Sequence, residues 1–359
     1  MANLLNGSTL TLVNTTLKNS ILNSTLNRTV SSTAPALNPV YDTFLIIQAL
    51  VIIAINGLVI FLFIWKPFLK EITNYFLVSL AISDGLTGLV VIPLYYACFL
   101  TGHVVEICFS FDMVHRMTAF STVYHLLLIT CDRYVAITRP FRHSSTFTST
   151  VGYLLLTVVW SAALFLPLIQ LAWYDPYNLK KSSMKAQRYE LHYNITCAVI
   201  AFLVPVVIMI LAYAEMLRIV TRHARAIEAT SRQQQALTKE KRAMVIFASM
   251  LLVYIVCWFT FFFSSLAQDL APNFLHVPEY VYLILFFLRF CTSIINPILY
   301  VFFKTDFKKA LREIVTQYKC SASTVTGFLL QNHSVSNNEE DDSSSPRAPM
   351  RQYTSRTRN

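Results

Sequence analysis

The chain is poor in charged residues. Asp, Glu, Lys and Arg make up only 13% of its 359 residues, whereas hydrophobic residues make up 55%. Soluble globular domains carry about 25% charged residues, so this shortage excludes an ordinary soluble domain. The formal net charge is +10, but the basic residues flank apolar runs and do not form one continuous patch. We therefore expect no nucleic-acid partner.

The sequence contains long runs of apolar residues with few charged residues inside them. Each is at least as long as the roughly 20 residues that a helix needs to cross a bilayer. We read seven of them, at 43–65, 74–99, 105–136, 151–173, 193–218, 243–267 and 279–303. Helices satisfy their backbone hydrogen bonds within lipid, whereas a β-barrel would show short alternating segments. The prediction is an all-α fold, a seven-transmembrane helix bundle in a lipid bilayer, followed by a short amphipathic helix.

Basic residues gather in alternate connections between the runs and after the last run. They include Lys66, Lys70, Arg139, Arg142, Arg222, Lys239, Lys304 and Lys308. Lys and Arg concentrate on the cytoplasmic side of membrane proteins, so we expect a multi-pass plasma-membrane protein with its N-terminus outside. The expected organisation is an extracellular glycosylated tail at 1–40, the bundle at 41–303, the amphipathic helix at 304–318 and a disordered cytoplasmic tail at 319–359.

The two tails carry modification signals. Asn-x-Ser/Thr sequons, the acceptors of N-linked glycans, occur on the outer side at Asn6, Asn14, Asn23, Asn27 and Asn194. On the inner side, Phe307, Leu311 and Ile314 share one face of the amphipathic helix. Cys320 follows it and is a candidate for palmitoylation.

Two polar motifs stand out within the apolar runs. They are Asp132, Arg133 and Tyr134 at the end of the third run, and Asn296, Pro297 and Tyr300 near the end of the seventh. Adjacent charges in a membrane-length helix are unfavourable unless they lie at the water boundary or are paired. Together these motifs resemble those of the rhodopsin-like (class A) family of G-protein-coupled receptors, over roughly residues 41–318.

The resemblance implies a receptor that is not an enzyme. Such a receptor transmits an extracellular small-molecule or peptide signal to a heterotrimeric G protein and binds an arrestin-type partner through its phosphorylated tail. The segment NYFLVSLAISDGLTGLVVIPL is similar to amine, adenosine and melatonin-type receptors. This likeness lies in the scaffold and leaves the chain an orphan-type receptor with no assigned ligand.

The resemblance also implies a two-state switch at the inner end of the bundle. In the resting state of such receptors, the arginine is held by its neighbouring aspartate and by an acid at the base of span six; here these are Arg133, Asp132 and Glu240. In the active state Tyr300 would swing toward the arginine. Trp258 matches the tryptophan at the pocket floor, but Thr260 replaces the proline that the family usually has two residues later.

Asp84 is a carboxylate at mid-membrane, where such a group must be protonated, paired or bound to a cation. The resemblance implies an allosteric sodium ion at this position. Thr122, Ser293 and Asn296 match the family's partner positions, and oxygen ligands suit a hard cation. We expect no other cofactor.

The cysteines depart from the family pattern. In the family, a cysteine at the start of span three usually bonds one in the second outer loop, and Cys108 fits the first position. Residues 174–192, which form that loop, contain no cysteine. Cys108 is therefore expected to pair with Cys98 or Cys197, or to stay free.

Charged residues of the outer halves suggest a ligand pocket. Asp112, His115 and Arg116 share one face of the third helix, and Arg289 lies in the seventh. With Trp258 below them, the three basic side chains can form a cradle for a carboxylate or phosphate group. The alternative is an internal ion pair of Asp112 with Arg116 or Arg289.

The ligand class stays open at this point. Amine receptors keep an aspartate seventeen residues before the aspartate of the Asp-Arg-Tyr motif, a place held here by His115. Visual pigments need a lysine where this chain has Phe290. We expect a small anionic ligand; the alternatives are a constitutively active receptor-like protein and, less favoured, an amine receptor or a membrane transporter.

Overall fold

The computed structural model describes residues 39–101, 104–173, 184–226, 231–270 and 279–317. The chain divides into two compact units, Met1–Lys304 and Thr305–Asn359. All regular elements in the described stretches are helical, which confirms the predicted all-α fold. In the second unit, residues 305–317 are helical, in line with the amphipathic helix expected at 304–318.

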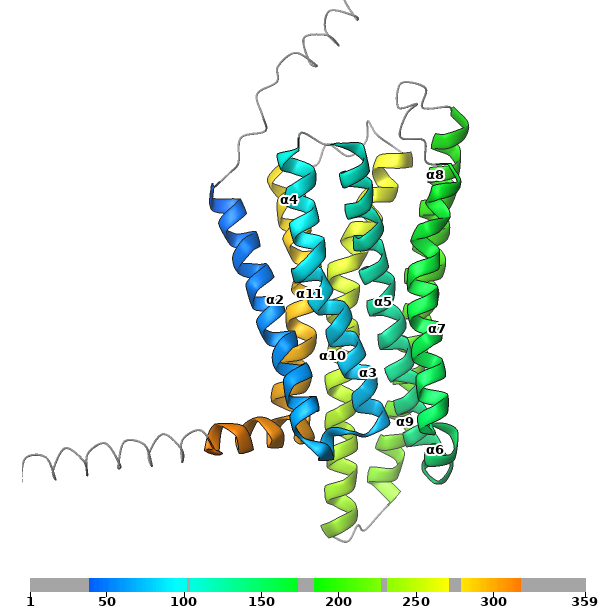
Figure 1. Ribbon diagram of the computed structural model, residues 1–359. Helices are drawn as coiled ribbons and strands as arrows, with labels where there is room; N and C mark the ends of the chain where they lie inside the picture. Colours follow the sequence, from blue (N-terminus) through cyan, green and yellow to red (C-terminus); the bar gives the residue numbers. More distant parts are fainter. Residues whose placement is uncertain (1–38, 102–103, 174–183, 227–230, 271–278, 318–359) are drawn as a thin grey trace, which may run out of the picture. The chain divides into compact units, whose positions relative to one another are not determined.

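The described helices of the first unit form seven long columns (Figure 1). The columns are α2 (Pro39–Trp65); α3 (Ile72–Leu86), the π-helical turn η2 (Thr87–Val91) and α4 (Ile92–Leu100); α5 (Val105–Thr138); α7 (Ser149–Leu168) and the 3-10 turn η3 (Ile169–Ala172); α8 (Met184–Cys197), the π-helical turn η5 (Ala198–Leu203) and α9 (Val204–Ala226); α10 (Ser231–Leu270); and α11 (Glu279–Phe303). Two short elements, η1 (Pro67–Leu69) and α6 (Pro140–Thr146), lie in connections on the inner side.

Each predicted apolar run lies within one column. Six columns are long and apolar enough to cross a membrane by length and composition. The other column, α5, carries charged residues such as Asp112 and Arg116, and it packs against α3, α4, α7, α9 and α10. The fifth column begins at Met184, earlier than the predicted 193, because a polar stretch continues the helix beyond the apolar run.

Each of the two π-helical turns lies just before a proline, with one residue between the turn and the proline. Pro93 follows η2 and Pro205 follows η5. A proline ring clashes with the carbonyl four residues earlier and offers no N–H to it. Those carbonyls belong to Leu89 and Ala201, which are members of the wide turns. The widened turn accommodates the missing hydrogen bond without ending the helix.

Two glycines permit close helix packing. A Cβ atom added at Gly88 would lie 2.8 Å from the backbone oxygen of Ala49 in α2, and one added at Gly152 would lie 2.2 Å from Cδ1 of Ile72. Real Cβ atoms do not approach other atoms this closely. Gly57, by contrast, has nothing within 4 Å of such a Cβ position.

A buried chain of hydrogen bonds joins α7, α3 and α5. Trp160 Nε1 donates to Ser79 Oγ at 2.9 Å, and Ser79 Oγ lies 2.8 Å from His125 Nε2. His125 Nδ1 lies 2.7 Å from the carbonyl oxygen of Ser121. Because a carbonyl only accepts, Nδ1 carries a proton. The Ser79 hydroxyl then donates to Nε2, and all three side chains are satisfied by a neutral imidazole.

Candidate functional site

Asp132 and Arg133 form a closed polar contact at the inner end of α5. Asp132 is fully buried. Its Oδ2 accepts hydrogen bonds from Arg133 Nε at 2.9 Å and from an Arg133 terminal nitrogen at 2.6 Å. Thr73 Oγ1, at the start of α3, donates to the same Oδ2 at 2.8 Å and accepts from Arg133 at 2.6 Å. The guanidinium is thus held by its neighbour and by a second helix.

The other oxygen of Asp132 is occupied as well. His143 Nε2, from α6, lies 2.8 Å from Oδ1 of Asp132. The His143 ring stacks on Phe147 with a centroid distance of 5.5 Å, and Phe147 in turn meets Phe76 of α3 edge-on. An ionised carboxylate can only accept, so His143 is the donor. Neither His143 nor Thr73 belongs to a motif that could be recognised in the sequence.

The remaining predicted switch residues lie in α5, α10 and α11. Tyr134 donates from its hydroxyl to Glu215 of α9 at 2.8 Å. Tyr300 is fully buried in α11, where Pro297 lies inside the helix. Glu240 belongs to α10, but its side chain lies outside the described residues, so its predicted pairing with Arg133 stays a prediction.

Trp258 is buried in α10, stacked near Tyr254 with ring centroids 6.0 Å apart. α10 continues as one helix from Ser231 to Leu270, through Thr260. The chain therefore has no proline-dependent break at this level, where the family usually has one.

Asp84 is buried at mid-membrane in α3 and binds α11. Its Oδ1 accepts from Ser293 Oγ at 2.9 Å and its Oδ2 accepts from Asn296 Nδ2 at 3.2 Å. The third predicted partner, Thr122, donates instead to the carbonyl of Thr118. The side-chain oxygens of Asn296 and Ser83 have no hydrogen-bond partner among the described residues. This set of oxygens fits a small hard cation.

Arg116 is engaged by residues of α5 and α8. Its Nε donates to Asp112 Oδ2 at 2.7 Å, one helical turn away, and its Nη1 donates to Asn194 Oδ1 at 3.1 Å. Glu190 Oε1 lies 3.8 Å from Arg116, and the Tyr193 ring lies 5.4 Å from its guanidinium. Arg116 therefore forms the internal ion pair with Asp112 that was the alternative to the basic cradle, and its part in an anion cradle stays a prediction.

Glu190 connects the contacts of Arg116 to the end of the column formed by α7 and η3. Its two oxygens accept hydrogen bonds from Gln170 Nε2 at 2.9 Å and from Trp173 Nε1 at 2.8 Å. Asp112 and Glu190 side chains are 37% and 38% exposed, whereas Arg116 is 15% exposed. One guanidinium thus lies between two carboxylates that water reaches.

His115 and Arg289 lie among aromatic rings. His115 is buried, and its ring centroid lies 5.6 Å from that of Trp258 and 6.0 Å from that of Phe290. The guanidinium carbon of Arg289 lies 4.5 Å from the centre of the Phe286 ring. The structure thus brings two of the predicted pocket residues, His115 and Trp258, into direct contact.

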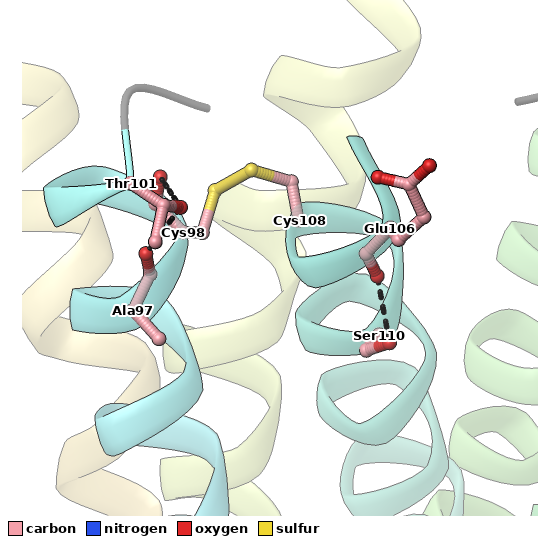
Figure 2. The surroundings of a disulfide bond; sticks show 6 residues. All are labelled: Ala97, Cys98, Thr101, Glu106, Cys108 and Ser110. Atoms are coloured by element: carbon pink, nitrogen blue, oxygen red, sulfur yellow. Dashed lines mark hydrogen bonds between the residues drawn. A yellow bond between two sulfur atoms is a disulfide. The ribbon is translucent and has the colours of Figure 1, made fainter. Parts of the chain in front are cut away.

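Cys108 forms a disulfide with Cys98, one of the two pairings left open by the sequence. Figure 2 shows the bond joining the end of α4 to the first turns of α5, with a Cα–Cα distance of 4.8 Å. Nearby hydroxyls of Thr101 and Ser110 donate to carbonyls of their own helices. Cys197 is buried and is not part of a disulfide. The bond therefore joins neighbouring helices and does not anchor the second outer loop to α5.

Several predicted modification sites can be compared with the structure only in part. Asn194 lies within α8, and its side-chain oxygen accepts from Arg116. A glycan would be attached to the Nδ2 atom of the same amide, next to this contact. Asn6, Asn14, Asn23, Asn27 and Cys320 lie outside the described residues.

Comparison with known proteins agrees with this arrangement. The family described as 7 transmembrane receptor (rhodopsin family) matches residues 55–300. The histamine H2 receptor of Rattus norvegicus is 30% identical over 261 residues, covering 68% of this chain and 71% of that receptor. The D(1C) dopamine receptor of Xenopus laevis is 26% identical over 306 residues, covering 74% and 65%. The octopamine receptor beta-2R of Chilo suppressalis is 26% identical over 291 residues, covering 70% and 73%.

The family match spans more than half of the chain and includes the contacts of Asp84, Asp132 and Arg133. Receptors of this family are not enzymes; they cross the plasma membrane several times and signal through G proteins. The chain therefore belongs to the rhodopsin family of seven-transmembrane receptors, as a multi-pass plasma-membrane receptor that couples to G proteins.

Proposed function

We propose that the chain is a receptor for a small anionic ligand that binds from the outer side near Arg289. A guanidinium in weakly polar surroundings forms strong, bidentate hydrogen bonds with a carboxylate or phosphate group. The observation that carries this proposal is the position of Arg289 over the Phe286 ring, in the aromatic cluster that includes Phe290. His115 and Trp258 would form the inner wall of the same site.

A ligand at this site acts only through its differential affinity for the two states of the bundle. In the resting state Arg133 is closed against Asp132 and Thr73. A ligand that favours the open state would release the guanidinium for the G protein. Trp258, in contact with His115, lies on the helix that this transition moves in the family.

A protonated amine is the second candidate ligand, because the relatives named above are receptors for histamine, dopamine and octopamine. Asp112 and Glu190 support it, since two part-exposed carboxylates share one guanidinium and leave a local formal charge of −1. An amine could exchange with Arg116 at Asp112. Against it stands His115, at the place where amine receptors keep their anchoring aspartate.

Purified receptor in nanodiscs, screened with anionic and amine libraries by nucleotide exchange on heterotrimers, separates the candidates. An anionic agonist should lose potency at least 100-fold in Arg289→Gln, lose less in Arg289→Lys, which keeps the charge but not the bidentate geometry, and be unaffected by Asp112→Asn. An amine agonist lost in Asp112→Asn and unchanged in Arg289→Gln would overturn the anionic proposal. High exchange without any ligand, abolished by Arg133→Ala, would support a constitutively active receptor.

We further propose that Asp84 holds an allosteric sodium ion, with oxygens from Ser293, Asn296 and Thr122. The proposal is supported by the buried carboxylate and by the unoccupied oxygen of Asn296 among the described residues. A bound cation would neutralise the carboxylate in the resting state. On the inner side, the Ser- and Thr-rich composition of residues 319–359 supports arrestin binding after phosphorylation.

A further inference from the structure

The first turn of α3 presents two consecutive polar residues to two different helices. Thr73 donates to Asp132 and accepts from Arg133, both in α5. Asn74, the next residue, accepts a hydrogen bond through Oδ1 from the ammonium group of Lys304, directly after the end of α11. One turn of helix therefore contacts the arginine switch and the inner end of α11.

The orientation of the Asn74 amide follows from its two contacts. Its Nδ2 donates to the carbonyl oxygen of Leu69 at 2.8 Å. Since a carbonyl only accepts, the amide oxygen is the atom left for Lys304. Asn74 is fully buried and Lys304 is only 9% exposed, so the ammonium is largely removed from water. A hydrogen bond to a charged group is stronger in such surroundings than at the surface.

Lys304 is linked directly to the last turn of α11. Its backbone N–H donates to the carbonyl of Tyr300 at 3.1 Å, so the two residues are one helical turn apart. Any shift of the inner end of α11 relative to α3 moves Lys304 away from Asn74. The contact thus spans the boundary that Tyr300 would have to cross to approach α5.

We propose that the Asn74–Lys304 contact is a second latch of the resting state, which must open before the receptor couples to a G protein. Consecutive Cα atoms are about 3.8 Å apart, so displacement of Thr73 also displaces Asn74. The two latches therefore open and close together. Thr73 and Asn74 are positioning residues of the switch. This inference rests on the coupling to G proteins and does not depend on the identity of the ligand.

Substitutions at Lys304 and Asn74 can either remove the hydrogen bond between the two residues or keep it. Lys304→Met keeps the length of the side chain and removes the ammonium, whereas Asn74→Leu removes the acceptor. Each should raise the ratio of open to resting receptor on the order of tenfold, as expected for a lost hydrogen bond to a charged group. The double variant should add little to either single change. Lys304→Arg, which keeps a cationic donor, should leave the ratio near the wild-type value.

Two measurements on the full chain in nanodiscs test the inference. The first is basal nucleotide exchange on a heterotrimer. The second is the ¹⁹F spectrum of trifluoromethyl-phenylalanine placed at Phe303, an exposed residue at the end of α11. The spectrum reports the position of α11 without any G protein. Lys70→Met, which removes an exposed cation from the same side, is the matched control.

Lys304→Met and Asn74→Leu should shift the ¹⁹F population and raise exchange, while Lys304→Arg and Lys70→Met should shift neither. The inference is overturned if the ¹⁹F spectra of Lys304→Met and Lys70→Met are the same. It is also overturned if the double variant opens the receptor much further than either single variant, because residues that act through one shared contact are not additive. A wild-type receptor that drives no exchange on any heterotrimer would contradict the coupling, and the ¹⁹F comparison would still decide the latch.

Discussion

His143 donates to one carboxylate oxygen of Asp132 at 2.8 Å while Arg133 and Thr73 occupy the other oxygen. A residue of the short inner helix α6 therefore takes part in the contacts that hold Asp132 and Arg133. The sequence motif alone identifies only Arg133 as the partner of Asp132. If Asp132 and Arg133 form the proposed switch, this contact makes α6 a contributor to the equilibrium between closed and open receptor.

His143→Phe should raise basal signalling. The phenylalanine ring can keep the stacking on Phe147, but the buried carboxylate loses one donor. A hydrogen bond to a charged group contributes about 1.5–3 kcal/mol, so basal nucleotide exchange should rise roughly tenfold or more. His143→Gln, whose amide can donate from a similar position, should return exchange toward the wild-type value. Equal exchange in the Phe and Gln variants would count against the role of this hydrogen bond.

Replacing Cys98 and Cys108 together by serine should lower thermal stability. In the chain-entropy view, a disulfide that closes a loop of about ten residues stabilises by about 3 kcal/mol. The unfolding midpoint of purified receptor should fall, whereas Cys131→Ser, at an exposed free cysteine, should leave it unchanged. Peptide mapping under non-reducing conditions should recover the peptide linked through Cys98 and Cys108. A linkage from Cys108 to Cys197 would contradict the structure.

Gly88→Ala should reduce the yield of folded receptor, because the new methyl group meets the backbone oxygen of Ala49. Overpacking of this kind costs about 1–3 kcal/mol. Gly57→Ala makes the same chemical change where nothing lies within 4 Å, so it should leave the yield unchanged or slightly raised. Fluorescence-detected size exclusion after a heating series measures both. Equal losses in the two variants would argue against the close approach of α2 and η2.

Ser79→Ala should destabilise the receptor more than a typical serine substitution. It removes the central member of the chain from Trp160 to His125 and leaves two buried groups without their partner. Each buried unsatisfied group costs about 1–3 kcal/mol. The ¹³C and ¹⁵N resonances of the His125 ring should report a neutral imidazole protonated on Nδ1. A ring protonated on Nε2 would show that His125 donates to Ser79, which is the opposite of the hydrogen-bond direction given above.

Sodium should stabilise the wild-type receptor against heat, and potassium at equal ionic strength should not. A cation that binds only the folded state raises its stability with concentration. Asp84→Asn removes the carboxylate and should abolish the difference between the two salts, while Asp112→Asn should retain it. A sodium effect that persists in Asp84→Asn would locate the ion elsewhere.

The positions of the helices could be predicted from the sequence because a bilayer demands long apolar runs. Their polar extensions could not: residues from Met184 continue α8 beyond the apolar run, and only the structure shows where that helix begins. Similarly, a proline in an apolar run predicts an irregular helix, but it does not predict that the irregularity is a π-helical turn, as observed before Pro93 and Pro205.

The site was predictable where its chemistry is local. Asp112 and Arg116 are four residues apart on one helix, a spacing that favours an ion pair, and the structure contains that pair. Contacts between distant residues were not accessible. Thr73 lies 59 residues from Asp132 and Asn74 lies 230 residues from Lys304. A threonine or lysine near a helix end resembles a solvated terminus until the neighbouring helix is known.

The column formed by α8, η5 and α9 touches α5 at both of its ends. On the outer side Asn194 accepts from Arg116, and on the inner side Glu215 accepts from Tyr134. Between them lies η5, a π-helical turn, and such turns occur frequently at functional sites. A molecule that displaces Arg116 from Asn194 would thus act on the same column whose far end binds the tyrosine of the Asp-Arg-Tyr motif.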